Sequence, residues 1–337
     1  MERVPEGNFA TEDRAAPVKP AMRKVALIYN PASGQYSARR AAAVAEAVAV
    51  LRAAGVDAEA FETGAPGSGM ALAAEAVRRG CDAIIACGGD GTVHEIVQSL
   101  VGTETALGVI PLGTANALAS DLGLIAPPAK AARMLLEAKP AQVSVGRIHY
   151  RESCGKTGSR YFIVAAGIGA DALLMSRLDA RLKRRLGYVL YLIEAFRIWA
   201  THSFPLFEAM LPENGNGGGR AVQISQLLAV RVRSFGGVLH NLAPGASLRN
   251  GTLSLLAFKT QNRLHYLRFL LAVMARRHSF EGAIELLETA SIECRAQDGA
   301  DGSYFVEADG EVLGTLPVRL EVAPHALRLL IPPGAQP

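Results

Sequence analysis

The sequence of 337 residues lacks long apolar runs and dense basic runs. No stretch of about 18 uninterrupted apolar residues occurs, which argues against a membrane-spanning helix. The net charge is only +4. No segment combines a basic run with interleaved aromatic residues, so we expect no nucleic-acid partner.

Cysteine is also scarce. The four cysteines show no metal-ligand spacing, and two of them lie in or beside apolar stretches, which is typical of reduced, buried thiols in a cytoplasmic protein. Residues 1–20 lack the apolar core of a signal peptide, and we expect residues 1–21 to be a disordered tail. The mean hydropathy of +0.20 fits contact with a membrane surface or apolar substrate, or simply an Ala- and Leu-rich core.

The most informative stretch runs from Ala83 to Glu95. An apolar run typical of a strand buried on both faces ends in Gly88-Gly89-Asp90-Gly91-Thr92. The glycines let the backbone approach a ligand, and the spacing of Thr92 and Glu95 predicts a capping box with a helix from Val93. Free amides at a helix N-terminus bind phosphate. A carboxylate beside phosphate favours Mg-nucleotide chemistry, although a tight turn with a solvated Asp90 fits the motif alone equally well.

Two further strands end in similar turns. The strand 24–29 leads into Asn30-Pro31-Ala32-Ser33-Gly34, and the strand 106–111 leads into Gly113-Thr114-Ala115-Asn116. In a doubly wound parallel sheet these ends lie on one side, where ligands bind. Together the turns predict a nucleotide cleft in an α/β domain covering residues 22–142.

After residue 142 the pattern changes to frequent short strands with turn signals, which predicts a β-sandwich domain over residues 143–332. Its last strand could return to the first domain. Two helical insertions are expected, at 170–200 and 264–278. Both are apolar and carry arginine or lysine, which fits ordinary core helices or a flank that rests on anionic lipid. The basic residues are Arg177, Arg181, Lys183, Arg184, Arg185, Arg268, Arg276 and Arg277.

The three turn motifs have the order and spacing seen in the diacylglycerol kinase catalytic-domain family, which includes soluble bacterial lipid kinases and sphingosine kinases. Residues 166–172 resemble the lipid-domain signature of that family, and Asp309-Gly310-Glu311 resembles its C-terminal Asp-Gly-Glu. The resemblance covers roughly residues 22–332. It implies an NAD kinase- or phosphofructokinase-like α/β nucleotide domain joined to a β-sandwich domain, with ATP and Mg²⁺ in the cleft between them.

The resemblance also implies roles for individual residues. Glu311 would be the general base that takes the proton of a lipid hydroxyl, Asp90 would act through Mg²⁺, and Asp171 would orient the acceptor head group. Without the resemblance, Glu311 reads as an exposed turn residue and Asp171 as a helix cap. The residues implied to hold ATP are Asn30, Pro31, Ala32, Ser33, Gly34, Thr63, Gly88, Gly89, Asp90, Gly91, Thr92, Val93, His94, Thr114 and Asn116.

One position departs from the family pattern. Asn250 stands in a loop where some bacterial members have an aspartate that holds a second, structural Mg²⁺. An amide binds Mg²⁺ more weakly than a carboxylate. Either the ion is absent, or it is held by Ser247, Asn250, Thr252 and backbone carbonyls.

Three functions follow as hypotheses. The first is an ATP-dependent lipid kinase that contacts an anionic membrane surface peripherally, with diacylglycerol, phosphatidylglycerol, a sphingoid base or ceramide as acceptor. The second is a soluble nucleotide kinase of the NAD kinase type, which shares the Gly-Gly-Asp-Gly-Thr motif. The third is a non-catalytic lipid- or nucleotide-binding module. A homodimer is compatible with all three.

Overall fold

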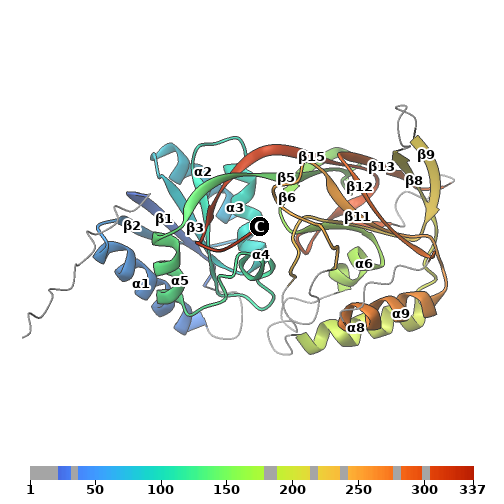
Figure 1. Ribbon diagram of the computed structural model, residues 1–337, viewed down its shortest axis with the longest axis horizontal. Helices are drawn as coiled ribbons and strands as arrows, with labels where there is room; N and C mark the ends of the chain where they lie inside the picture. The colour runs from blue at the N-terminus through green and yellow to red at the C-terminus, as the bar shows by residue number, and fades with distance from the viewer. Residues whose placement is uncertain are drawn as a thin grey trace, which may run out of the picture.

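The computed structural model describes residues 22–31, 37–177, 188–212, 219–235, 242–275, 282–297 and 304–337. They form two lobes that lie side by side along the long axis of the molecule (Figure 1). The expected tail at 1–21, the turn residues Ala32, Ser33 and Gly34, and the basic residues Arg181, Lys183, Arg184, Arg185, Arg276 and Arg277 lie outside the described residues.

The N-terminal lobe is a parallel α/β sheet, as predicted, and its three inner strands are short, buried apolar runs. All six residues of β3 are buried. The strand order is β4 (Ala106–Pro111), β3 (Ala83–Gly88), β1 (Lys24–Tyr29) and β2 (Asp57–Glu62). The helices are α1 (Ser37–Ala53), α2 (Ser68–Arg78), α3 (Asp90–Leu100), α4 (Ala117–Asp121) and α5 (Pro128–Leu136).

The C-terminal lobe is an antiparallel β-sandwich, also as predicted. One layer has the order β12 (Ile284–Thr289), β11 (Leu253–Phe258), β10 (Gln226–Val230), β7 (Ala165–Gly169), β14 (Phe305–Ala308) and β15 (Glu311–Ile331). The other joins β9 (Gly219–Ile224), β8 (Phe207–Pro212), β13 (Ser291–Arg295), β15, β5 (Lys139–Arg151) and β6 (Thr157–Phe162). Both layers contribute to one apolar core, which includes Ile168 and Leu255 from the first and Phe207 and Leu320 from the second.

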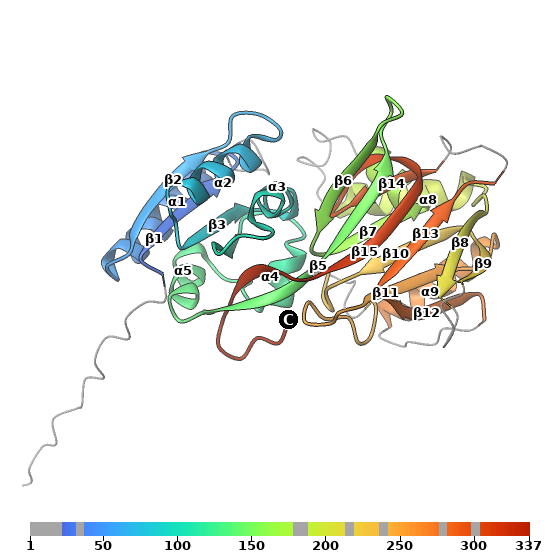
Figure 2. The same ribbon diagram turned by 90° about the horizontal axis from the view of Figure 1, so that it is seen from above.

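Two long strands connect the lobes. β5 and β15 pair with each other along most of their length, and Leu329 near the end of β15 pairs with Leu107 of β4 in the first lobe. Figure 2 shows both strands running from one lobe into the other. The last strand therefore returns to the N-terminal sheet, and it is much longer than the short strands expected for this part of the chain.

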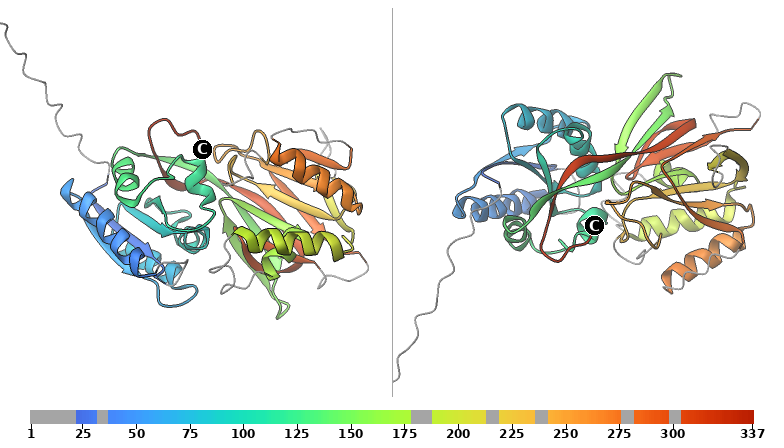
Figure 3. Two further views of the ribbon diagram at one scale, coloured as in Figure 1. Left: turned by 90° about the horizontal axis from the view of Figure 1, so that it is seen from below. Right: turned by 45° about the horizontal axis from the view of Figure 1, so that its top comes forward.

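The helical insertion expected at 170–200 is described as two helices, α6 (Ala170–Arg177) and α8 (Tyr188–Thr201). The second insertion is α9 (Arg263–Met274). Both α8 and α9 lie on the outer side of the sandwich (Figures 1 and 3). Among the described residues, no helix combines the length and the apolar character needed to cross a bilayer.

Candidate functional site

The glycine turns after β3 and β4 are in direct backbone contact. A β-carbon added to Gly113 would collide with Cα of Gly89, so neither turn has room for a side chain there. The side chain of Asn116 accepts a hydrogen bond from the amide of Gly113 and donates to its carbonyl, both at 2.9 Å. Asn116 was predicted to bind ATP, but it stabilises its own turn, which holds the Gly113 backbone against the Gly89 turn.

Asp90 is the first residue of α3 and joins the two turns. Its Oδ1 accepts a hydrogen bond from the amide of Ala117 at 2.8 Å. Burial raises the pKa of Asp90, and the negative charge of Asp309 raises it further, while the backbone amides oppose the shift. The helix begins here and not at Val93, because the capping box does not form: Glu95 accepts from the amides of Gly67 and Gly69 at 2.8 Å, at the start of α2.

An arginine that sequence reasoning missed holds two of the turns together. Arg40 on α1 is 6% exposed, and its guanidinium donates to the carbonyls of Asn30 at 3.1 Å and Leu112 at 2.6 Å. These carbonyls lie at the ends of β1 and β4. An arginine in an Ala-rich helix carries no local signal of such a role.

The turn Asp309–Gly310 connects β14 to β15 and fastens them to the start of β7. Both residues have positive φ, 50° and 85°, as in the tight hairpin turns for which Asp-Gly is favoured. The carboxylate of Asp309 accepts hydrogen bonds from the amides of Ile163, Val164 and Ala165 at 2.8–3.1 Å. This buried carboxylate is therefore saturated with donors and rigid.

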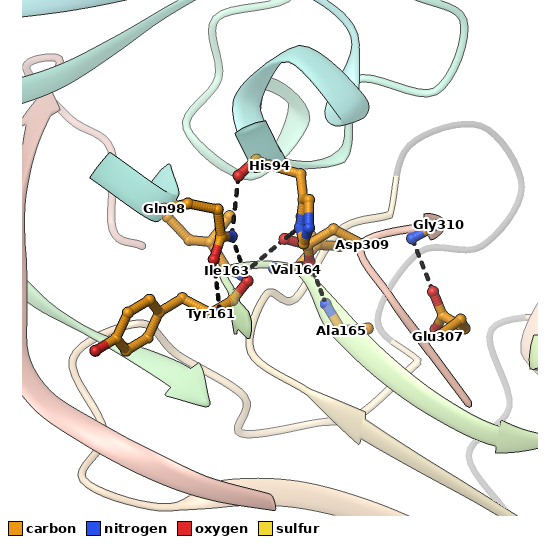
Figure 4. A network of polar contacts seen from close by, with 9 residues as sticks. All are labelled: His94, Gln98, Tyr161, Ile163, Val164, Ala165, Glu307, Asp309 and Gly310. Carbon is orange, nitrogen blue, oxygen red and sulfur yellow. Dashed lines mark hydrogen bonds and ion pairs between the residues drawn. The ribbon is translucent and has the colours of Figure 1, made fainter. Parts of the chain in front are cut away.

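Helix α3 is fastened to this turn and to β6. His94 is 5% exposed, and its Nδ1 lies 3.2 Å from Oδ2 of Asp309. Gln98 exchanges two hydrogen bonds with the backbone of Tyr161, at 2.8 and 2.9 Å (Figure 4). His94 was predicted to hold ATP, but its side chain is buried in the contact between the lobes. The N-terminus of α3, with Asp90, is thus anchored to the C-terminal lobe.

This anchoring brings Glu311 to the start of α3. Glu311 directly follows the Asp309–Gly310 turn and is exposed. Its Oε1 lies 3.2 Å from the point where a β-carbon on Gly91 would lie. Asp90 and Glu311 are 221 positions apart in the chain, yet they flank the same helix N-terminus.

Beside this turn lies a pair of acids, Asp171 and Glu307. Glu307 is 3% exposed, and its Oε2 accepts a hydrogen bond from the amide of Gly310 at 2.7 Å. Burial, with the charge of Asp171 next, raises the pKa of Glu307 well above its ordinary value, and burial also raises that of Asp171. Both carboxylates occupy the space that a β-carbon on Gly167 would need. Glu307 therefore favours its protonated form more strongly than an exposed glutamate does.

The three residues predicted to hold a structural Mg²⁺ act as hydrogen-bond donors within the protein, and their part in metal binding stays a prediction. Thr252 donates to Glu288 at 3.2 Å, Asn250 donates to the carbonyl of Gly245 at 2.9 Å, and Ser247 donates to the C-terminal carbonyl at 2.6 Å. The described residues contain no cluster of three or more His, Cys, Asp or Glu placed to bind a metal.

A buried arginine takes the place of a cation in this loop. Arg231 is 1% exposed, and its guanidinium donates to the carbonyls of Ser144, Leu248, Asn250 and Thr252. Burial lowers its pKa to about 10, so it remains charged at neutral pH. The loop that carries Asn250 is therefore held by a positive charge that is part of the chain.

The remaining predicted ATP residues lie around the same turns. Thr63 is buried just after β2, and Thr114 is exposed within the turn that follows β4. Thr92 packs back on Gly88, and its side chain fills the space that a β-carbon there would need. Asn30 and Pro31 follow β1, and Val93 is buried in α3. Their part in nucleotide binding stays a prediction.

Comparisons with known proteins agree with this architecture. The family model described as "Diacylglycerol kinase catalytic domain" matches residues 24–148, and the one described as "YegS C-terminal NAD kinase beta sandwich-like domain" matches residues 163–331. A protein of Chromohalobacter salexigens named "Probable lipid kinase YegS-like" is 32% identical over 299 residues, which cover 87% of this chain and 89% of that protein.

A diacylglycerol kinase of Mycobacterium tuberculosis is 30% identical over 313 residues, covering 92% of this chain and 95% of that protein. Among solved structures, a diacylglycerol kinase from Bacillus anthracis superposes with a TM-score of 0.69 at 21% identity, covering 94% of this chain and all of that chain. At this identity the superposition shows the shared fold.

Proposed function

The chain belongs to the diacylglycerol kinase catalytic-domain family, and on that premise we propose that it transfers the γ-phosphate of ATP to the hydroxyl of a membrane lipid. One observation supports this most: the carboxylate of Glu311, from the C-terminal lobe, lies against Gly91 at the N-terminus of α3. A helix N-terminus with free amides attracts phosphate, and a carboxylate beside it is placed to accept a proton.

In this mechanism Glu311 accepts the proton of the lipid hydroxyl. The lipid oxygen forms a bond to the γ-phosphorus while the bond from that phosphorus to ADP breaks. Phosphoryl transfer depends on alignment and charge neutralisation more than on covalent chemistry. The amides of Gly89 and Gly91, at the start of α3, would align the phosphates.

The carboxylate of Asp90 suits a hard cation such as Mg²⁺ that arrives with the nucleotide. When bound, Mg²⁺ would supply charge neutralisation on the phosphates. Asp90 is suited to face it, because burial and Asp309 disfavour its anion in the free protein and a cation would stabilise that anion.

The buried acid pair would serve the acceptor side. Glu307 fixes the amide of Gly310 directly before the base, so it sets the direction in which Glu311 leaves the turn. Asp171 is partly exposed. Its carboxyl group can form a hydrogen bond with the polar head group of the lipid.

The test is transfer of radiolabelled phosphate from ATP to a panel of lipid alcohols in mixed micelles, with product identification by mass spectrometry. Label should enter one lipid class in the unmodified chain. The Glu311→Gln variant should lose at least about a hundredfold in rate, whereas Glu321→Gln on the same strand should not. Phosphorylation of NAD in place of lipid, or ATP binding without transfer to any lipid, would overturn the proposal.

A further inference from the structure

Helices α8 and α9 form one outer face of the C-terminal lobe, which we call the α8–α9 face. Two hydrogen bonds connect the end of α8 to the start of α9. The indole of Trp199 donates to the carbonyl of Arg263 at 2.9 Å, and the guanidinium of Arg263 donates to the carbonyl of Ala200 at 2.7 Å. Figure 1 shows both helices along one side of the lobe, and the left view of Figure 3, from below, shows both of them in front of the sandwich strands.

This face concentrates the exposed apolar side chains of the described chain. Nine large hydrophobic side chains are markedly exposed among the described residues, and five of these lie on α8 and α9. They are Ile193, Phe196, Leu264, Leu270 and Leu271. Phe196 is the most exposed of all nine, at 67%. A cluster of this kind on a helix pair marks a surface that contacts a partner or a membrane.

These outward side chains are not part of the core. The inner faces of the same helices pack separately: Ile198 is 3% exposed, Val273 is 2% exposed, and Phe269 contacts Phe258 edge-on with ring centroids 5.1 Å apart. On α9, Leu264 and Leu271 share the outer face with the exposed Arg268, as their spacing of four and three residues requires.

The charge of the face is positive. α8 and α9 carry Arg197, Arg263 and Arg268 but only one acid, Glu194. The side chain of Glu194 is 15% exposed, whereas that of Arg197 is 69% exposed. Arg177 at the end of α6 and Arg197 line a shallow hollow of about 410 Å³ together with Glu194 and Thr201. Two guanidinium groups at one hollow suit the phosphate of an anionic lipid head group.

We propose that the α8–α9 face rests on the surface of an anionic bilayer. Phe196, Leu264 and Leu271 enter the interfacial region, and Arg177 and Arg197 contact lipid phosphates. Interspersed arginines and large apolar side chains match such a surface. A second copy of the chain fits less well, because pairing two of these faces would bring like charges together.

The position of α6 connects this face to the candidate site. α6 packs against both α8 and β14, and it carries Asp171 in its first turn. A lipid taken up at the α8–α9 face would therefore reach Asp171 and Glu311 along α6. This last step rests on the proposed kinase function, but binding of the face to a bilayer does not.

The experiment is co-sedimentation of the full chain with vesicles of phosphatidylcholine, with and without phosphatidylglycerol. The Phe196→Glu/Leu271→Glu variant should lose at least about tenfold in affinity for the anionic vesicles. Two apolar side chains that the bilayer would bury are replaced by negative charges that anionic lipid repels. Arg197→Glu should lose roughly tenfold. The unmodified chain should bind vesicles without phosphatidylglycerol more weakly.

Two matched controls lie on the other lobe. Ile125→Glu changes a side chain that is 60% exposed. Arg78, like Arg197, pairs with a glutamate three residues earlier in its helix, and the two arginine side chains are 68% and 69% exposed. Arg78→Glu is therefore the control for Arg197→Glu. Both controls should bind like the unmodified chain, and thermal melts should confirm that all variants fold.

Equal vesicle binding by the α8–α9 variants and the controls would overturn the proposal. A shift in sedimentation velocity from dimer to monomer, with vesicle binding unchanged, would assign the face to a second copy. Transfer to a short-chain, water-soluble lipid is measured in parallel. If neither the unmodified protein nor any variant transfers phosphate to this lipid, while vesicle binding still differs between the α8–α9 variants and the controls, the kinase function is refuted. The membrane-binding role of the α8–α9 face is then still supported.

Discussion

In the N-terminal lobe the contact between the glycine turns is made largely of backbone, since the turns at Gly89 and Gly113 touch without side chains between them. In the C-terminal lobe buried ionisable side chains hold the turns and loops in place, chiefly Asp309, Glu307 and Arg231. A backbone contact needs particular small residues at particular positions. Buried ionisable groups need every partner in place, because an unpaired buried polar or charged group is costly. The two lobes should therefore respond differently to substitution.

The largest loss of stability is expected for Asp309→Ala. The change leaves the buried amides of Ile163, Val164 and Ala165 without their acceptor and removes the group facing His94. With about 1–3 kcal/mol for each unsatisfied group, we expect a loss on the order of 4 kcal/mol in the free energy of unfolding. Urea unfolding measures it, with the exposed Asp57→Ala as control. A loss no larger than that of the control would contradict the rigid role of the turn.

Arg231→Met should cost slightly less, roughly 3 kcal/mol, because four carbonyls lose a shared donor while the methionine keeps most of the packing. Arg249→Met, an exposed change in the same loop, is the control. EDTA should leave the melting temperature of the unmodified chain unchanged, since the bound cation is a side chain. A fall with EDTA that Mg²⁺ reverses would show that the loop holds a metal after all.

In the N-terminal lobe, Gly113→Ala tests the backbone contact between the two glycine turns. The new β-carbon meets the backbone of Gly89 and the side chain of Asn116, so the two turns must separate. The reason is space and not charge. We expect the variant to fold but to bind ATP at least about tenfold more weakly, as seen by calorimetry. Gly64→Ala has open space around the new β-carbon and should bind ATP normally; equal affinities would refute the contact between the turns.

The smallest effect concerns Glu307 and its raised pKa. Below its ordinary value of 4.5, the folded and unfolded chains both hold the proton. As the pH rises past that value, the unfolded chain loses its proton and the folded chain keeps it. Stability therefore falls with rising pH, by at most about 1.4 kcal/mol per unit, until the raised pKa is passed.

The Glu307→Gln variant lacks this titration, so its free energy of unfolding should depend less on pH between about 5 and 7. Denaturant titrations at several pH values measure the difference. A variant that follows the pH dependence of the unmodified chain would rule out the raised pKa of Glu307. Because the amide oxygen of the new side chain can still accept a hydrogen bond from Gly310, activity at neutral pH should fall only a few fold.

The same contrast explains what could be predicted from the sequence. Strands 24–29 and 106–111 and the two glycine turns were readable because apolar runs and glycines act locally. Asp309-Gly310-Glu311 was recognised only through its resemblance to the Asp-Gly-Glu of the family, although Asp-Gly also favours a hairpin turn. The end-to-end length of β15 was not predictable, because its pairing is interrupted by bulges.

The partners of buried charges were not predictable, because they are remote in the chain. Arg231 binds carbonyls near residues 144 and 250, and Glu95 binds amides at 67 and 69 in place of the local capping box. Glu307 and Arg40 had no motif of their own. Their roles became visible only in the contacts that the folded chain creates.

The central claim is that Asp90 and Glu311, from different lobes, act on one bound triphosphate. A double-mutant cycle on the rate of phosphate transfer tests it most directly, with Asp90→Asn, Glu311→Gln and the double variant, each at saturating ATP. The account predicts that each single change is severe and that the double variant is about as slow as the slower single variant, as for residues that work as a unit. Losses that multiply, or full activity in Glu311→Gln, would contradict it.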